Sequence, residues 1–423
     1  MVELIANVNS AVNGFVWGVP MLVLLVGTGI LMTILTKFFQ LSHIGHWFKN
    51  TVGGIFHDEH VTKHTEAGDQ SISQFQSLCT ALAATIGTGN IVGVASALVA
   101  GGPGAIFWMW VVAFFGMMTN YSENVLGIYY RRRNSKGEWS GGAMYYLKDG
   151  LGSYKGCKQV GAVLAVLFSA FCLLASFGIG NMSQVNSIAA NMSSAFSIPA
   201  TATGIVLVII GALVIVGGLK RIAAVTEKLV PFMAIAYVIG ALVIFFANIS
   251  HVGAVFTAIF KGAFGLRAVG GGIVGSGVKL ALTWGMKRGV FSNEAGLGSS
   301  VMVHSSSNVK EPVRQGMWGI FEVFADTMVV CTLTAFAVLS SGLIDLDTGA
   351  VLVDVSGSAL VGQAFATVFG SFGPAFIAIA ILLFAFSTVL GWSHYGSTAC
   401  EYLFGTKSTI VYKIAFVLMI FIG

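Results

Sequence analysis

Long apolar stretches alternate with short polar segments along the whole chain. Most of these stretches run for about 20 residues, the length that a helix needs to cross the hydrocarbon core of a bilayer. We therefore predict an all-α polytopic membrane protein. Its ten predicted spans are residues 15–36, 72–99, 104–130, 160–190, 200–218, 223–247, 268–289, 315–340, 373–395 and 410 to the end.

Three segments between the spans carry a different pattern. Residues 250–264 are amphipathic and too short for a confident span, so they predict a helix lying at the membrane interface. Residues 141–151 predict a second short surface helix. The loop after the first span is rich in histidine; His57, His60 and His64 are spaced to share a helix face and bind a metal, but acidic neighbours favour a solvated polar loop.

The second predicted span is interrupted by the run ATIGTGN at residues 84–90. Glycine weakens a helix by roughly 1 kcal/mol relative to alanine, and lipid cannot satisfy the backbone groups that a break sets free. Such a break persists where it lines a cavity or binds a ligand, so this run predicts a binding site at mid-membrane depth. The alternative is a glycine kink that only lets helices pack closely.

A broken helix offers two kinds of ligand group. The half after the break presents free N–H groups and a positive dipole end, which suit a carboxylate. The half before it presents free carbonyls, which suit Na⁺ or an ammonium group. We therefore expect a zwitterion and a cation to be held by Thr85, Ile86, Gly87, Thr88, Gly89 and Asn90.

The seventh predicted span is also rich in glycine, at residues 270–277 and again further along. We predict its break at Thr283, Trp284 and Gly285, with residues 275–277 as the alternative. Interrupted helices at matching places in two halves are typical of inverted-repeat transporters.

Polar and aromatic side chains in other spans are further candidates for the site. Gln184 can meet the amine or carboxylate of a substrate, or make a hydrogen bond between helices. Phe177 and Trp392 can wall the site and limit the substrate's side chain, or simply pack between helices.

Charged residues inside spans are expensive to bury. Glu322 and Asp326 lie four residues apart on one face of the eighth span, Glu123 lies in the third and Lys279 in the seventh. They predict either a relay for protons or cations, or pairing between helices.

Composition agrees with a membrane protein, since 56% of residues are hydrophobic and 9% are charged, against about 25% charged in soluble domains. Lys and Arg gather in the loops after the odd-numbered spans. These loops are therefore predicted to be cytoplasmic, with the N-terminus outside, in the plasma (inner) membrane.

The five cysteines form no C-x-x-C pair and are interpreted as small buried residues. No span carries a hydrolase or metalloprotease motif, so we do not expect an enzyme, an organic cofactor or a metal other than Na⁺.

Four motifs, in chain order, resemble those of the alanine or glycine:cation symporter family. They are IGTGNIVGVA at 86–95, the segment beginning GGPGAIFWMW at 101–116, KRGVFSNEAGLGS at 287–299 and STVLGWSHYG at 387–396. The resemblance implies a leucine-transporter-type fold of two inverted five-helix repeats preceded by one extra helix. It also implies coupling of Na⁺, or H⁺ in some members, to uptake of alanine, glycine and related small amino acids.

On this pattern residues 1–71 are the extra helix and the His-rich loop, 72–247 the first repeat, and 248–423 the interfacial helix and the second repeat. The second repeat has four predicted spans where five are expected, so we expect its last core helix to be missing from this chain. The expected partners are a small neutral amino acid, Na⁺ and the lipid bilayer, with no nucleic acid; the sequence sets no oligomeric state.

The resemblance also implies an ion site. The Na⁺ site shared across this fold would use carbonyls near Ala83 and Ile86 and the hydroxyls of Ser387 and Thr388, the last also near the substrate. For both hydroxyls the alternative is back-bonding within their own helix. The function predicted is Na⁺-coupled symport by alternating access. H⁺ coupling through Asp326 or Glu123 is the alternative, and a channel with an open lining is a further one.

Overall fold

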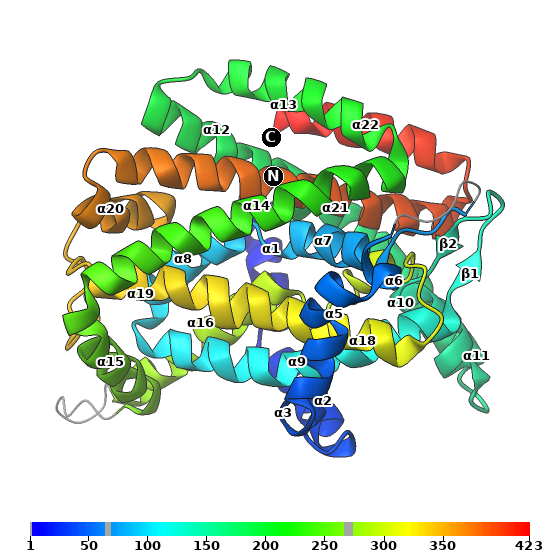
Figure 1. The fold of residues 1–423 in the computed structure, drawn as a ribbon, viewed down its shortest axis with the longest axis horizontal. Helices are drawn as coiled ribbons and strands as arrows, with labels where there is room; N and C mark the ends of the chain where they lie inside the picture. Colours follow the sequence, from blue (N-terminus) through cyan, green and yellow to red (C-terminus); the bar gives the residue numbers. More distant parts are fainter. Residues whose placement is uncertain (1, 64–68, 266–273) are drawn as a thin grey trace.

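The computed structural model of the chain describes residues 2–63, 69–265 and 274–423, and these are almost entirely helical (Figure 1). His64 and the glycines at 270–272 lie outside the described residues. Six helices within the described part are long and apolar enough to cross a membrane. A further pair, bent by 50° at a short break, passes the same test together. The prediction of a polytopic helical membrane protein is confirmed.

The N-terminal segment is built from one long apolar pair of helices followed by short ones. The apolar pair is α1 (Val2–Val16) and α2 (Val19–Leu35), joined at Trp17 and Gly18. The short helices are α3 (Phe39–Ser42), α4 (Ile44–Asn50), α5 (Val52–His57) and α6 (Glu59–Thr62). In Figure 1, α2 lies at the lower edge of the helices that run across the view.

The next group of helices corresponds to predicted spans two to six. They are α7 (Gln74–Thr85), the π-helical turn η1 (Gly89–Gly93), α8 (Val94–Gly101), α9 (Gly104–Tyr130), α11 (Lys158–Phe177), the π-helical turn η4 (Gly178–Met182), α12 (Ser183–Phe196), α13 (Ala200–Ile215) and α14 (Gly218–Ala247). Between α9 and α11 lie the small antiparallel pair β1 (Arg132–Arg133) and β2 (Trp139–Ser140), and then α10 (Ala143–Tyr145) with the turns η2 (Tyr146–Gly150) and η3 (Leu151–Ser153).

The last group corresponds to the predicted interfacial helix and spans seven to ten. After the turn η5 (Ile249–His251) come α15 (Val252–Phe264), α16 (Val274–Asn293), α17 (Val301–His304), α18 (Pro312–Val323), the π-helical turn η6 (Phe324–Cys331), α19 (Thr332–Ser340), α20 (Gly357–Phe369), α21 (Phe372–Phe404) and α22 (Ser408–Ile422). Helix α20 packs as a hairpin against α21 and has no counterpart among the predicted spans. Figure 1 shows β1 and β2 at the opposite end of the bundle from α15 and α20.

The first helix break lies where the glycines predict it. Helix α7 begins at a capping box formed by Ser73 and Gln76 and ends at Thr85. Ile86 leaves the helical region with ψ 88°, and the chain becomes helical again at Gly89. Because both halves are apolar and buried, this break lies inside the bundle.

The second break is not at Thr283, Trp284 and Gly285, nor at residues 275–277, and both predictions are wrong. Helix α16 runs without interruption to Asn293, and the chain unwinds afterwards, before α17 begins at Val301. Within the unwound segment, Glu294, Gly296 and Gly298 have φ of 55°, 89° and 69°, a region that glycine tolerates best.

Gly285 serves helix packing instead. A Cβ built on Gly285 would lie 2.3 Å from the carbonyl oxygen of Ala105 in α9, so only glycine lets α16 and α9 approach this closely. At Gly277, two turns earlier on the same helix, a Cβ would meet no atom of the described residues within 4 Å.

These two glycines give a matched test of the packing. We expect Gly285→Ala to destabilise the folded protein by about 1–3 kcal/mol through overpacking against α9. Gly277→Ala is expected to be neutral or slightly stabilising, because alanine favours a helix. Thermal unfolding of the two purified variants in detergent measures the difference; equal stabilities would contradict the close approach.

Candidate functional site

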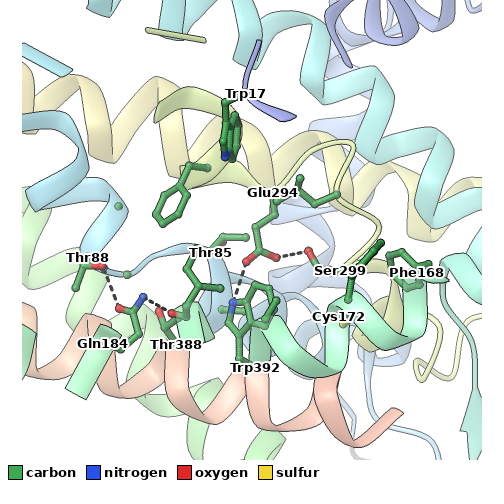
Figure 2. A pocket seen from close by; sticks show the side chains of 18 residues that line it. Trp17, Thr85, Thr88, Phe168, Cys172, Gln184, Glu294, Ser299, Thr388 and Trp392 are labelled. Atoms are coloured by element: carbon green, nitrogen blue, oxygen red, sulfur yellow. Dashed lines mark hydrogen bonds between the residues drawn. The ribbon is translucent and has the colours of Figure 1, made fainter. Parts of the chain in front are cut away.

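A cavity of about 290 Å³ lies between the two helix breaks. Figure 2 shows side chains from several parts of the chain pointing into it. Its lining comes from the turn between α1 and α2, from the first break with the end of α7, from α11, η4 and α12, from the second break with the end of α16, and from α21. The residues are Trp17, Ala84, Thr85, Gly87, Thr88, Gly89, Phe168, Phe171, Cys172, Ala175, Ile179, Gln184, Phe291, Glu294, Leu297, Ser299, Thr388 and Trp392.

The first break contributes backbone groups to the cavity. The Gly87 N–H donates to Asn90 Oδ1 at 2.9 Å, which holds the turn in place. The Thr88 N–H points at Gln184 Oε1, at the limiting distance of 3.5 Å. The Gln184 amide is in turn oriented by donating to the Ile179 carbonyl at 3.0 Å. The predicted residues Thr85, Gly87, Thr88, Gly89 and Gln184 therefore share one cavity.

Helix α21 forms the wall opposite this break. A Cβ on Gly87 would lie 2.4 Å from Thr388 Oγ1, and one on Gly391 would lie 2.7 Å from the Ala84 Cβ. A Cβ on Gly180 in η4 would fall 2.4 Å from the Trp392 ring. Trp392 is thus fixed between η4 and the cavity, and it lines the cavity as predicted.

The second break places a carboxylate in the cavity. Glu294 is 4% exposed. Its Oε1 accepts a hydrogen bond from Trp392 Nε1 at 3.0 Å, and its Oε2 accepts one from Ser299 Oγ at 2.5 Å (Figure 2). The sequence analysis did not select Glu294 as a site residue. One feature of the sequence points to Glu294. It begins the run EAGLG, and the two glycines of this run indicate that the helix ends there.

Three of the residues predicted to hold the ion, Ala83, Ser387 and Thr388, are connected by hydrogen bonds. Ser387 Oγ donates to the Ala83 carbonyl at 3.2 Å, which joins α21 to the end of α7. Ser387 and Thr388 also donate to the Phe384 carbonyl, at 2.8 and 3.0 Å. Both hydroxyls therefore bond within their own helix, which was the alternative to an ion site, and Ser387 also makes the contact to α7. Ile86, the first non-helical residue, is buried.

Several predicted residues lie away from the cavity. Asn90 is fully buried and donates to Asp326 Oδ1 at 2.7 Å instead of facing the cavity. Phe177 packs on Tyr412 and Phe416 of α22, with ring centroids 5.3 and 6.1 Å apart. Thr283, Trp284 and Gly285 lie within α16 and contribute nothing to the cavity lining. Their assignment as substrate-binding residues rested on that misplaced break.

Asp326 links the two breaks behind the cavity. It accepts from Asn90 of the first break, and its Oδ2 accepts from Ser292 Oγ at 2.8 Å, two residues before the second break. Thr327 Oγ1 also donates to it at 2.8 Å. A buried carboxylate in such a position needs these donors, since an unpaired one would be costly.

The other charged residues within predicted spans have structural partners or face outward. Glu123 of α9 accepts the N–H groups of Gly296 and Gly298 at 3.2 and 3.0 Å, so it satisfies backbone freed by the second break. Glu322 Oε2 lies 2.9 Å from His304 Nε2 in a fully buried pair. Lys279 is exposed on α16.

The bundle end that carries β1 and β2 is closed beneath the cavity. The segment before α7 is bonded to the segment after α17: Ile72 donates to the Ser306 carbonyl at 3.0 Å, and Asn308 donates to the Ile72 carbonyl at 2.8 Å. The Arg131 guanidinium donates to the carbonyls of Ser307 and Val309, each at 2.6 Å. These contacts tie the two broken helices together at this end.

A charged loop residue reinforces this closure. Burial of Asp69 tends to raise the pKa of its carboxyl, but hydrogen bonds from Ser71 and the positive charges of Arg133 and Lys220 outweigh this effect and hold the pKa below its usual value. Asp69 therefore stays ionised at neutral pH and holds its position between β1 and α14.

Two broken helices that contribute to one shared cavity are typical of a secondary membrane transporter. Residues 2–423 match the family model described as "Sodium:alanine symporter family". The chain therefore belongs to the sodium:alanine symporter family, which confirms the family resemblance in its motifs.

Individual relatives agree with this membership. The "Sodium/alanine symporter AgcS" of Methanococcus maripaludis is 45% identical over 422 residues, covering 100% of this chain and 88% of that protein. The "Probable sodium/glutamine symporter GlnT" of Bacillus subtilis is 35% identical, covering 100% and 83%. The "Putative sodium/proton-dependent alanine carrier protein YrbD" of the same species is 37% identical, covering 94% and 79%.

The fold is that of a leucine-transporter-type protein, as the sequence analysis predicted. A crystal structure of the Eremococcus coleocola manganese transporter superposes with a TM-score of 0.55 at 13% identity, covering 86% of this chain and 74% of that one. At this identity the likeness concerns the arrangement of helices alone.

The contact between Gly87 and Thr388 provides a test of the site geometry. We expect Gly87→Ala to destabilise the protein by about 1–3 kcal/mol, because its methyl group would overlap Thr388 Oγ1. Adding Thr388→Ala to Gly87→Ala removes that oxygen and should restore most of the loss. Thermal unfolding of the single and double variants measures the coupling; strictly additive effects would contradict the contact.

Proposed function

We propose that this protein couples Na⁺ to the uptake of small neutral amino acids, alanine and glycine, by alternating access. The carrying observation is the pairing of the two breaks around one cavity. The first break brings backbone N–H groups and the second brings the Glu294 carboxylate. A zwitterion needs both kinds of group, because its two ends carry opposite charges.

The substrate carboxylate is assigned to the first break. The N–H groups near Thr88 and Gly89 begin the half-helix that continues into α8, where the helix dipole favours an anion. Gln184 stands beside them and can exchange its bond to the Thr88 N–H for a bond to the substrate. Gly87 has no side chain that would block this approach.

The substrate ammonium is assigned to the side of Glu294. Figure 2 shows Glu294 and Thr88 on different sides of the cavity, with Trp392 below. The carboxylate already accepts from Trp392 and Ser299, so it is oriented before substrate binds. Each carboxylate oxygen retains a further lone pair for a third donor.

The coupling ion is assigned to the contact between α7 and α21. Carbonyls of unwound helix ends bind Na⁺ in transporters of this architecture, and Ala83, Ser387 and Thr388 already lie within hydrogen-bond reach of one another or of shared partners. Ile86 and Thr85 would complete the set from the break itself. Asn90 acts from behind, by fixing the Gly87 turn.

The position of the closing contacts supports alternating access. The bonds of Ile72 and Arg131 seal one end of the bundle by joining the segments next to α7 and α17. These segments adjoin α7 and α17, the parts of the two broken helices that lie toward this end, so separating them would open the cavity here. In the proposed orientation this end faces the cytoplasm, because the basic loops lie there, and the protein resides in the plasma membrane with its N-terminus outside.

Proton coupling is the second candidate function. The observation that favours it is the position of Asp326, which is hydrogen-bonded to residues next to both breaks. The relative YrbD carries both ions in its name. Proteoliposomes separate the two ideas: robust alanine accumulation driven by a pH gradient in Na⁺-free buffer would favour H⁺, whereas accumulation only with a Na⁺ gradient supports the main proposal.

If Thr388 is a ligand of the coupling ion, removing its hydroxyl should weaken the apparent affinity for Na⁺. We expect Thr388→Ala to raise the Na⁺ concentration for half-maximal alanine uptake by about tenfold, since one oxygen ligand to a cation is worth about 1.5 kcal/mol or more. Thr398→Ala, on the same helix and bonded to His394, serves as the matched control. Uptake in proteoliposomes over a Na⁺ series measures both. An unchanged Na⁺ dependence in Thr388→Ala would refute the assignment.

If Glu294 binds the substrate ammonium group, removing its charge without changing its shape should weaken substrate binding. We expect Glu294→Gln to weaken alanine binding by about tenfold or more, because the amide keeps the side-chain size but loses the attraction for a cation. Glu311→Gln changes the same charge at an exposed position and should leave binding unchanged. Calorimetric titration of alanine in saturating Na⁺ gives both affinities; equal affinities for Glu294→Gln and wild type would exclude this role.

A further inference from the structure

The buried pair of His304 and Glu322 lies outside the cavity lining and has no part in the proposed function. Both side chains are 0% exposed, and His304 Nε2 lies 2.9 Å from Glu322 Oε2. His304 is the last residue of α17, the part of the second broken helix next to the closed end of the bundle, whereas Glu322 belongs to α18. The pair therefore joins the second broken helix to the helix that follows it.

Gln315 and Ser77 extend this pair into a buried hydrogen-bond network. The other ring nitrogen, His304 Nδ1, lies 2.6 Å from Gln315 Nε2. Gln315 Nε2 also donates to Ser77 Oγ of α7 at 3.3 Å, and Ser77 Oγ donates to the Val303 carbonyl at 3.2 Å. Ser307 Oγ donates to Gln315 Oε1 at 3.1 Å. The network thus holds the closed-end parts of both broken helices, α7 and α17, against α18.

This network has room for the histidine in either of two protonation states. When Gln315 Nε2 donates to Nδ1 of the His304 ring, the ring donates from Nε2 to Glu322 and is neutral. Turning the Gln315 amide over places its oxygen against Nδ1 and its nitrogen against Ser307 Oγ. The ring then donates from both nitrogens, as an imidazolium does. Because the two ends of an amide have nearly the same shape, both states fit the same packing.

The surroundings of Glu322 favour the state with the additional proton. Asn120 of α9 donates to Glu322 Oε2 at 3.0 Å, but Oε1 has no hydrogen-bond partner among the described residues. Within that part of the chain, His304 is the ion-pair partner that lies within 4 Å of this carboxylate. With a neutral histidine the interior would hold an uncompensated negative charge, which is costly. One added proton makes the pair neutral overall.

The titratable groups on the neighbouring elements strengthen this preference. Three carboxyl groups are placed to repel a negative charge on Glu322: Glu123 of α9, Glu294 of the second break and Asp326 of η6. The other titratable groups at this place are two arginines that bind elsewhere, Arg131 to the carbonyls of Ser305, Ser307 and Val309 and Arg314 to Asp58, and on α21 Tyr395 and His394, the latter bonded to the Met302 backbone. The side chain that α7 contributes, Ser77, is uncharged.

We propose that His304 and Glu322 form a proton-binding site that holds this end of the bundle closed. With its proton the pair is a charge-assisted hydrogen bond in a dry interior, which is a strong contact. When the end opens, water solvates both groups and the carboxylate no longer needs the proton. The closed state then holds one proton more than the open state, so closure is stabilised at low pH and this stabilisation is lost as the pH rises. The proposal rests on the proposed function in taking the opening of this end as a step of transport.

The proton of this site enters and leaves on one side of the membrane. Ser306 and Ser307, which make the closing contacts, lie two and three residues after His304. The pair therefore exchanges its proton with the water at this end, and no proton is carried across. This separates the site from coupling through Asp326, in which the proton would accompany the substrate.

Hydrogen–deuterium exchange of the purified protein in detergent measures the closure directly. The reporter segments are residues 70–77 and 303–309, which carry the N–H groups of Ile72 and Asn308 that are bonded across this end. Exchange rates at pH 6 and pH 8 are each divided by the chemical exchange rate at that pH. We expect the protection of both segments to fall about tenfold between the two pH values, because the open state becomes more populated.

Two substitutions of nearly constant shape test whether this pair is responsible. Glu322→Gln removes the buried charge, so protection should stay high at both pH values. His304→Gln keeps a donor and an acceptor but takes no proton, so protection at pH 6 should fall toward the native value at pH 8. Glu311→Gln, at an exposed position of the same end, is the matched control and should keep the native pH response. Native protection that does not change with pH, or a native pH response in both pair variants, overturns the proposal. The native measurement decides the matter even if a variant fails to fold.

Alanine uptake into proteoliposomes separates this proposal from the proposed function. If Na⁺ drives no alanine uptake while exchange still responds to pH through His304 and Glu322, the proposed function fails and the proton site stands. If Na⁺ drives alanine uptake and native protection is independent of pH, the proton site fails and the proposed function stands.

Discussion

Backbone groups cannot remain unpaired in lipid, and the rest of this structure depends on how that constraint is met at two broken helices. At the first break, Asn90 takes the Gly87 N–H and Gln184 approaches the Thr88 N–H. At the second, Glu123 takes the N–H groups of two glycines, while Glu294 is held by Trp392 and Ser299. Of these groups, Thr88, Gln184 and Glu294 line one cavity, where we propose that a charged substrate meets them.

The sequence predicted the first break because glycine, threonine and asparagine interrupt an apolar run. It misplaced the second because glycine has two uses in a membrane helix. At Gly285 the missing side chain allows close contact with α9, whereas at Gly296 it allows a positive φ. Composition does not separate these uses, since the difference lies in the partner helix and the local backbone. Helix α20 was missed for a related reason: at 13 residues it is too short to read as a span.

Individual site residues were predictable where the direction of the side chain depends on a single helix or its end. Thr88, Gln184, Thr388 and Trp392 lie in the cavity because their own helices face it. Asn90 and Phe177 turn away toward Asp326 and α22, which depends on tertiary packing that a single span does not encode. The same holds for Trp17 and Glu294, which reach the cavity from a loop and from an unwound segment, where helical periodicity gives no direction.

The central claim is that one site between the two breaks binds an amino acid and Na⁺ together. If so, each ligand must raise the affinity of the other by the same factor. Equilibrium binding to the purified protein measures this directly, with alanine titrated at several Na⁺ concentrations and Na⁺ titrated with and without saturating alanine. The account predicts two equal enhancement factors. Alanine binding that is independent of Na⁺ would contradict it.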